Sequence, residues 1–98
     1  MIRHIFMAPV KEGVSEELLG RKMDEMRSLK SRVPEVEALM VGKSTGWVGM
    51  EHAVVMVVDL KDKSAFDALM QSQAHIEISQ KADEAFDTSG FVASQVEF

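Results

Sequence analysis

The sequence predicts an α+β fold in which strands and helices alternate in the order β-α-β-β-α-β. Three observations indicate this class. Four short apolar runs have the length and composition of strands. Two longer segments place apolar residues at helical spacing. The chain has 98 residues, 46% of them hydrophobic, which is enough for one core and too apolar for a disordered chain, so we expect a single domain over residues 1–98.

The first strand and the first helix occupy the N-terminal third. Residues 2–8 are apolar and stop before Pro9, as expected for a strand. Ser15 is a good N-cap, and the two glutamates that follow it favour a helix N-terminus. The helix is expected to end before Pro34. Its apolar stripe consists of Leu19, Met23, Met26 and Leu29 or Lys30.

Two strands are predicted in the middle of the chain. Residues 35–44 predict the second strand, and residues 51–60, which are rich in Val, predict the third. The loop between them contains Trp47, for which we expect contact with a partner subunit or with a core edge. Strict alternation in the second strand gives one face of Val36, Ala38 and Met40 and another of Leu39 and Val41.

The last third predicts an interrupted helix and a final strand. A helix begins after a turn at residues 59–63 and breaks near Ser72. A second helical stretch follows, Gly90 ends the turn after it, and residues 91–98 form the final strand. The inward residues of the two helical stretches are Phe66, Leu69, Met70, Ile78, Ala82, Ala85 and Phe86. The complete order is that of the ferredoxin-like arrangement.

The third strand is apolar on both faces, which predicts a homodimer. Val54, Met56, Val58 and Leu60 alternate with Ala53, Val55 and Val57. Two helices cover only one face of a four-stranded sheet, and an uncovered apolar face exceeds what a soluble monomer tolerates. We expect two copies to pack sheet to sheet, with an apolar ligand on the open face as the alternative. The predicted interface residues are Ile5, Met7, Leu39, Val41, Val55 and Val57, with Val92 and Val96 as companions.

Charge and composition argue against several function classes. The net charge of −5 disfavours nucleic acid and anionic membrane as partners. The chain has no Cys, so disulfides and thiolate chemistry are absent. No apolar run approaches the roughly 20 residues of a membrane span, and the N-terminus does not resemble a secretory signal. We therefore expect a cytoplasmic protein.

The three histidines are the candidate chemical groups. His4 and His52 fall on the strand faces assigned to the helix side, and their rings would lie close together if the first and third strands are neighbours. His75 lies at the helix break, which would aim it inward as a base. The alternative is that each ring is a buried, hydrogen-bonded structural histidine. No metal-ligand spacing links the three, so we expect no metal and no cofactor.

Four segments in order resemble one family over essentially the whole chain. They are the opening Met1-Ile2-Arg3-His4-Ile5, the helix start Lys11–Glu17, the strand Glu51–Val55 and the segment Gln73–Ile76. Together they resemble the stress-responsive A/B barrel (Dabb) domain. The resemblance implies a dimeric α+β barrel in which two ferredoxin-like sheets close on each other. Family functions are mixed and include plant stress proteins, a plant polyketide cyclase and many bacterial proteins without an assigned activity.

The resemblance also implies a site. In the cyclase type, proton transfer uses the histidine that matches His75 and a Tyr six residues earlier, near histidines that match His4 and His52. Here the Tyr position holds Leu69, which removes a phenolic group suited to proton transfer. The family's pocket between helices and sheet would be lined here by Met23, Met26, Val54, Leu69, Met70 and Phe86.

Two functions follow as hypotheses. The first is binding or acid–base processing of an apolar carbonyl or polyketide-like small molecule, with His75 aided by His4 and His52 as the catalytic residues. The second is a non-catalytic stress-responsive or assembly protein with structural histidines. A cofactor-independent monooxygenase is a third reading, because related dimeric α/β barrels host that chemistry.

Overall fold

The computed structural model describes residues 1–98 and has the predicted α+β, ferredoxin-like fold. Four strands form one antiparallel sheet in the order β2-β3-β1-β4. No helix combines the length and the apolar character that crossing a membrane requires. The elements in chain order are β1 (Ile2–Pro9), α1 (Glu16–Arg27), α2 (Leu29–Arg32), β2 (Val36–Lys43), β3 (Ala53–Leu60), α3 (Lys63–Gln71), α4 (Gln73–Gln80) and β4 (Val92–Glu97).

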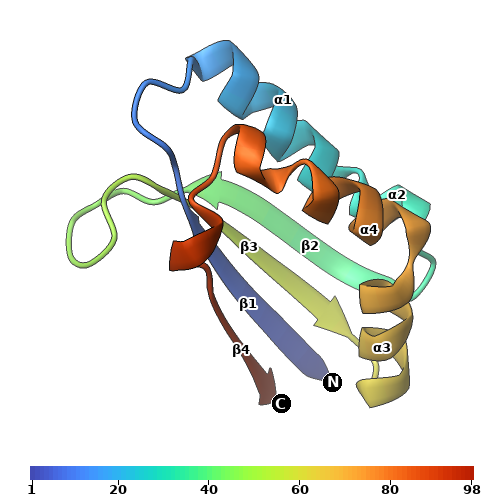
Figure 1. Ribbon diagram of the computed structural model, residues 1–98. Helices are drawn as coiled ribbons and strands as arrows, with labels where there is room; N and C mark the ends of the chain where they lie inside the picture. The colour runs from blue at the N-terminus through green and yellow to red at the C-terminus, as the bar shows by residue number, and fades with distance from the viewer.

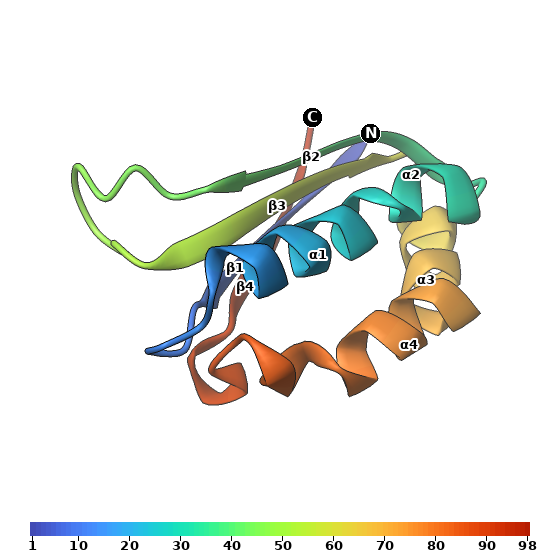
Figure 2. The same ribbon diagram turned by 90° about the horizontal axis from the view of Figure 1, so that it is seen from above.

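All helices lie on one face of the sheet (Figure 1). The view from above separates the two layers, with α1 and α2 over one part of the sheet and α3 and α4 over the other (Figure 2). The opposite face of the sheet carries no helix. The β2–β3 loop projects beyond the end of the sheet, and its Trp47 is 87% exposed. This chain alone therefore leaves one sheet face and one loop without cover.

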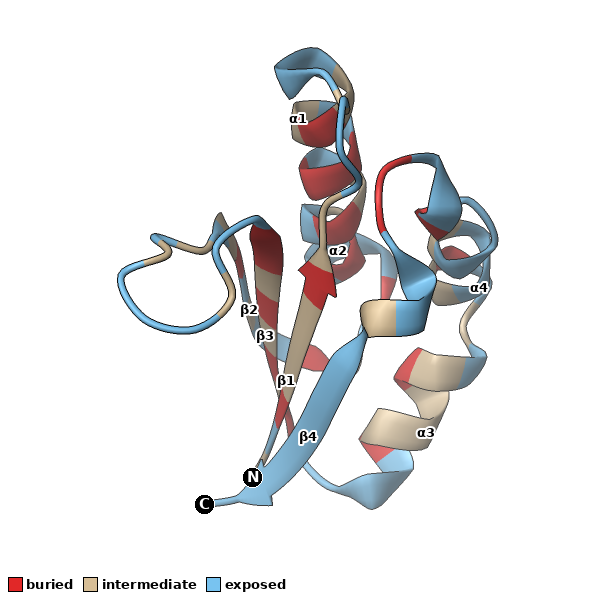
Figure 3. Ribbon diagram, turned by 60° about the vertical axis from the view of Figure 1, so that its left-hand side comes forward, coloured by how far each residue is buried: buried red, intermediate tan, exposed pale blue.

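The inward face of β3 is the centre of the core. Val54, Val58 and Leu60 have no exposed surface, and Met56 is 5% exposed. Figure 3 shows buried and half-buried residues alternating along β3, whereas the edge strand β4 is exposed throughout. The alternation expected from the sequence is confirmed for this strand, and the helices pack on its apolar row.

A bulge in β2 reverses part of the predicted face assignment. Val36 pairs with Leu60 but Ala38 already pairs with Asp59, so Glu37 is an extra residue in the ladder. The prediction that Leu39 and Val41 lie on the open face is wrong. They pair with Val58 and Met56, respectively, and lie on the helix side. On the open face they are replaced by Met40, which pairs with Val57 and is 53% exposed.

Side-chain caps fix where the helices start. Ser15 accepts a hydrogen bond from the Leu18 amide at 3.1 Å and caps α1, as predicted. Asp62 caps α3 in the same way. α4 is shorter than the predicted second stretch: it ends at Gln80, and a short 3-10 turn at Ala82–Glu84 follows. The predicted inward residues Ala82, Ala85 and Phe86 are nevertheless buried.

Leu69→Ala should be strongly destabilising, because Leu69 is a fully buried residue of α3. We expect the free energy of unfolding to fall by about 3 kcal/mol, from lost burial and the cavity left behind. Urea unfolding followed by circular dichroism measures the change. Gln71→Ala, an exposed position on the same helix, is the control and should change stability by less than about 0.5 kcal/mol. Equal losses for both variants would contradict this account of the core.

Candidate functional site

A cavity of about 280 Å³ lies between the sheet and the helices. It is lined by 15 residues, 10 of them hydrophobic, so its wall is mostly apolar. The polar members of the wall are His4, Lys22, Glu25, His75 and Ser79. The apolar members are Phe6, Met26, Leu29, Met56, Met70, Ile78, Ala82, Phe86, Phe91 and Ala93. Two imidazoles in a largely apolar cavity make this the candidate site.

His4 is held rigidly within the sheet. It lies on the central strand β1, where it pairs with Val58 of β3 on one side and with Gln95 of β4 on the other. Its side chain points to the helix side and is only 6% exposed. The ring packs edge-on against Phe66 at 5.4 Å between centroids, and the Gln95 amide nitrogen lies 2.9 Å from its Nδ1.

His75 reaches the cavity because the helix is interrupted at Ser72. Ser72 has an extended backbone, and its hydroxyl accepts a hydrogen bond from the His75 amide at 3.1 Å, which starts α4 in a new direction. His75 therefore lies in the first turn of α4 and lines the cavity. The predicted break and its inward aim are both present in the structure.

Burial keeps both imidazoles neutral near pH 7. Loss of solvent lowers the pKa of His4 below 6.5, and a charge on His75 would lower it further. Burial also lowers the pKa of His75, and a hydrogen bond between its ring and the Met70 backbone partly offsets that effect. A neutral imidazole offers one N–H donor and one acceptor nitrogen. The cavity thus holds two groups able to accept or donate a proton.

Lys22 is a polar wall residue that the sequence reasoning missed. It is 5% exposed, donates a hydrogen bond to the Lys81 carbonyl at 3.2 Å and forms an ion pair with Glu84. The pair lowers the pKa of the Glu84 carboxyl. These contacts join α1 to the turn after α4 and close one side of the cavity. The sequence signal that could have identified Lys22 is its position next to Met23 and Met26 on the inward stripe of the helix.

Three of the six predicted pocket residues line the cavity, namely Met26, Met70 and Phe86. Met23, Val54 and Leu69 are not among the residues that line it, and they pack within the core. They share helix and strand faces with residues that do line the cavity. Periodicity assigns a side chain to a face, but it does not say whether a neighbouring side chain covers it.

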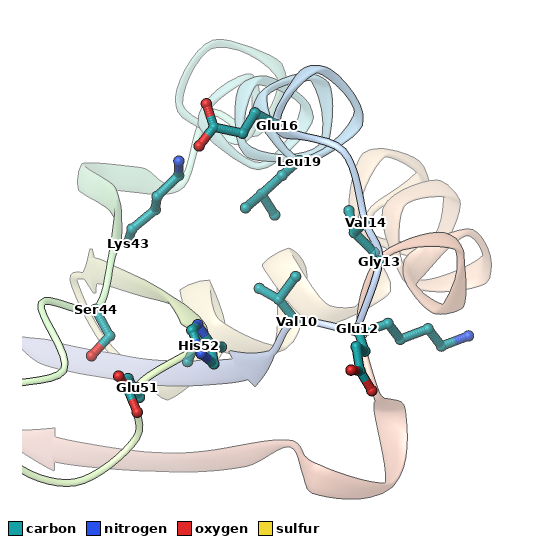
Figure 4. A pocket seen from close by; sticks show the side chains of 12 residues that line it. Val10, Glu12, Gly13, Val14, Glu16, Leu19, Lys43, Ser44, Glu51 and His52 are labelled. Carbon is teal, nitrogen blue, oxygen red and sulfur yellow. The ribbon is translucent and has the colours of Figure 1, made fainter.

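The structure does not bring His52 to the other two histidines. β1 and β3 are neighbours, but they run antiparallel, so His4 pairs with Val58 near the opposite end of β3 from His52. His52 instead lines a different, more polar pocket of about 630 Å³ (Figure 4). In that pocket it lies with Glu51, across from Glu16 of α1. The expected cluster of three rings is therefore a pair.

No group of three or more His, Asp or Glu side chains is placed to hold a metal ion. In the cavity wall, the residues of types that commonly bind metals are His4, His75 and Glu25. The chemistry that this arrangement supports with its own groups is proton transfer.

The fold and the site together define a ferredoxin-like α+β protein with a small cavity under its helices. The sequence of residues 2–93 matches the family model of the stress responsive A/B barrel domain. The chain belongs to this family. No curated protein matches the chain significantly.

Solved structures with the same fold have low sequence identity to this chain. A protein from Arabidopsis thaliana superposes with a TM-score of 0.83 at 18% identity, covering 100% of this chain and 95% of that one. A dimeric ferredoxin-like protein of unknown function from Thermobifida fusca gives 0.83 at 20%, with 99% and 90% covered. A hydroxynitrile lyase from Passiflora edulis gives 0.81 at 15%, with 97% and 90% covered.

Both cavity histidines should titrate below pH 6.5, because burial disfavours their charged forms. Following the ring C–H signals by NMR from pH 8 to pH 4.5 measures the two midpoints. The unfolded chain binds these protons first as the pH falls, so the free energy of unfolding should also decrease below about pH 6.5. A midpoint at or above 6.5 for either ring would show that the ring is solvated and that the cavity is open to water.

Proposed function

We propose that this protein binds a small apolar carbonyl compound in the cavity and transfers a proton on it, with His75 and His4 as the acid–base groups. The observation that carries the proposal is a pair of neutral imidazoles, one buried and one half-buried, in one apolar cavity. A base whose pKa lies near or below the ambient pH is available in its unprotonated form without a metal to activate it.

The size and lining of the cavity support a small, apolar ligand. Its volume of about 280 Å³ is at the lower end of ligand pockets, which span roughly 300–1,000 Å³. Phenylalanine rings and methionines form much of the wall. Methionine adapts to irregular ligand shapes, and the aromatic rings offer flat apolar surfaces. A compound with one ring and a short chain fits this description.

The identity of residue 69 supports assigning the acid–base roles to the two imidazoles. Leu69 stands where the cyclase type of this family has a Tyr, and it is fully buried in the core. No phenol is available, because the chain contains no Tyr. The hydroxynitrile lyase among the structural relatives is consistent with small-molecule chemistry on this fold. Proton transfer here falls to His75 and His4.

We also propose that the protein acts as a homodimer through the open sheet face. The structural relatives include proteins described as dimeric and ferredoxin-like. All four strands contribute apolar residues to this face, and at one end Arg3 and Asp59 neutralise each other in a two-bond ion pair of 2.7 and 2.9 Å. The apolar residues of this face are Ile5, Met7, Met40, Val55, Val57, Val92 and Val96.

His75→Phe should abolish proton transfer. The probe is phenylacetone in D2O, in which NMR follows replacement of the hydrogens between the ring and the carbonyl by deuterium. We expect the wild-type protein to accelerate exchange and His75→Phe to lose about 10²-fold or more of that acceleration, the usual contribution of a positioned base. His52→Phe, the same substitution in the other pocket, should keep it. Equal exchange in wild type and His75→Phe would contradict a catalytic role.

Val57→Asp should dissociate the proposed dimer. An unpaired charge buried between two sheets costs about 3–5 kcal/mol, which raises the dimer Kd at least about 100-fold. Light scattering at micromolar concentration measures the mass. Gln71→Asp, which adds the same charge on an exposed helix position, should leave the dimer intact. A wild-type protein that is monomeric at this concentration would disprove the interface.

A further inference from the structure

Gln95 contacts one ring nitrogen of His4 from the neighbouring strand. It lies on the edge strand β4 directly opposite His4 in the ladder, on the same face of the sheet. Its Nε2 is 2.9 Å from His4 Nδ1. An amide nitrogen only donates hydrogen bonds, so Nδ1 must accept. In the neutral ring the proton then resides on Nε2.

His4 Nε2 has no partner within the protein. The only side-chain hydrogen bond of His4 is the one to Gln95. In this structure, every side-chain nitrogen or oxygen that is closed off from solvent has a hydrogen-bond partner. Nε2 has no partner, so it is not closed off. Because the ring as a whole is 6% exposed and lines the cavity, its Nε2–H opens into that cavity. It is a donor without an acceptor, inside an apolar site.

His75 offers the complementary group. It lines the same cavity from the first turn of α4. A neutral imidazole always has one ring nitrogen without a proton, and that nitrogen holds a free electron pair. The cavity therefore presents one hydrogen-bond donor, from His4, and one proton acceptor, from His75.

We propose that Gln95 is a positioning residue that fixes His4 as the hydrogen-bond donor, and that the pair selects enolisable ketones and aldehydes. This inference rests on the proposed function. The carbonyl oxygen accepts the His4 Nε2–H, and the free nitrogen of His75 takes a proton from the α-carbon. The C–H electron pair becomes the C=C bond of an enolate, whose oxygen keeps the His4 hydrogen bond. His75 returns the proton to carbon, which restores the ketone and both neutral rings.

The tautomer is tested without any ligand. In ¹⁵N NMR spectra of the free protein near pH 7.5, His4 should show a protonated Nε2 and an unprotonated Nδ1. Gln95→Leu removes the donor, so both nitrogens should move toward averaged values. Gln95→Glu supplies an acceptor at the same place, so the proton should move to Nδ1. Glu97→Leu changes the next residue on the same strand face and should leave His4 unchanged.

A protonated Nδ1 in the wild-type protein would overturn the inference, and so would a tautomer that Gln95→Leu leaves fixed. Phenylacetone exchange supplies the second readout. Loss of a preorganised donor should lower kcat by about tenfold to hundredfold in Gln95→Leu with little change in KM, and Gln95→Glu should be at least as slow. If the wild-type protein has the fixed Nε2–H tautomer but does not accelerate exchange, the proposed function is disproved while the positioning role of Gln95 stands. Exchange that is independent of Gln95 would disprove its positioning role alone.

Discussion

The packing of helices on the inward row of β3 is the constraint on which the rest of this structure depends. Val54, Met56, Val58 and Leu60 share one buried core with apolar residues of all four helices, and their burial favours the association of the two layers. The helices cover only that side (Figure 2). The cavity is consequently on the covered side, and the other side of the sheet is left as an uncovered apolar face.

The cavity exists because the helical layer does not fill the space over β1 and β4. The interruption at Ser72 starts α4 in a new direction, and the cavity lies between the helices and the sheet, with His4 in its wall. Lys22 and Glu84 hold the far wall in place. The site is thus assembled from a helix break and an ion pair, and the close-packed core under Leu69 supports it.

The two histidines differ in how they are positioned, and the difference matters for chemistry. His4 is fixed by a strand, by an aromatic ring and by an amide from the neighbouring strand. His75 is fixed by the capped start of a short helix. In the proposed reaction the donor is held by the sheet and the acceptor by a helix, so the two roles stay separate, as a preorganised acid–base pair requires. His52, by contrast, belongs to the rim of a separate, polar pocket.

The sequence by itself determined the element order, the cap at Ser15, the helix break near Ser72, the inward row of β3 and the side of the sheet on which His4 lies. These are local properties, set by side-chain period and by hydrogen bonds within a few residues. Only the tertiary structure decided the rest. A one-residue bulge at Glu37 moved Leu39 and Val41 to the helix side, antiparallel pairing separated His52 from His4, and strand register placed Gln95 on Nδ1. Register depends on partners far away in the chain, and a shift of one residue exchanges the two faces of a strand.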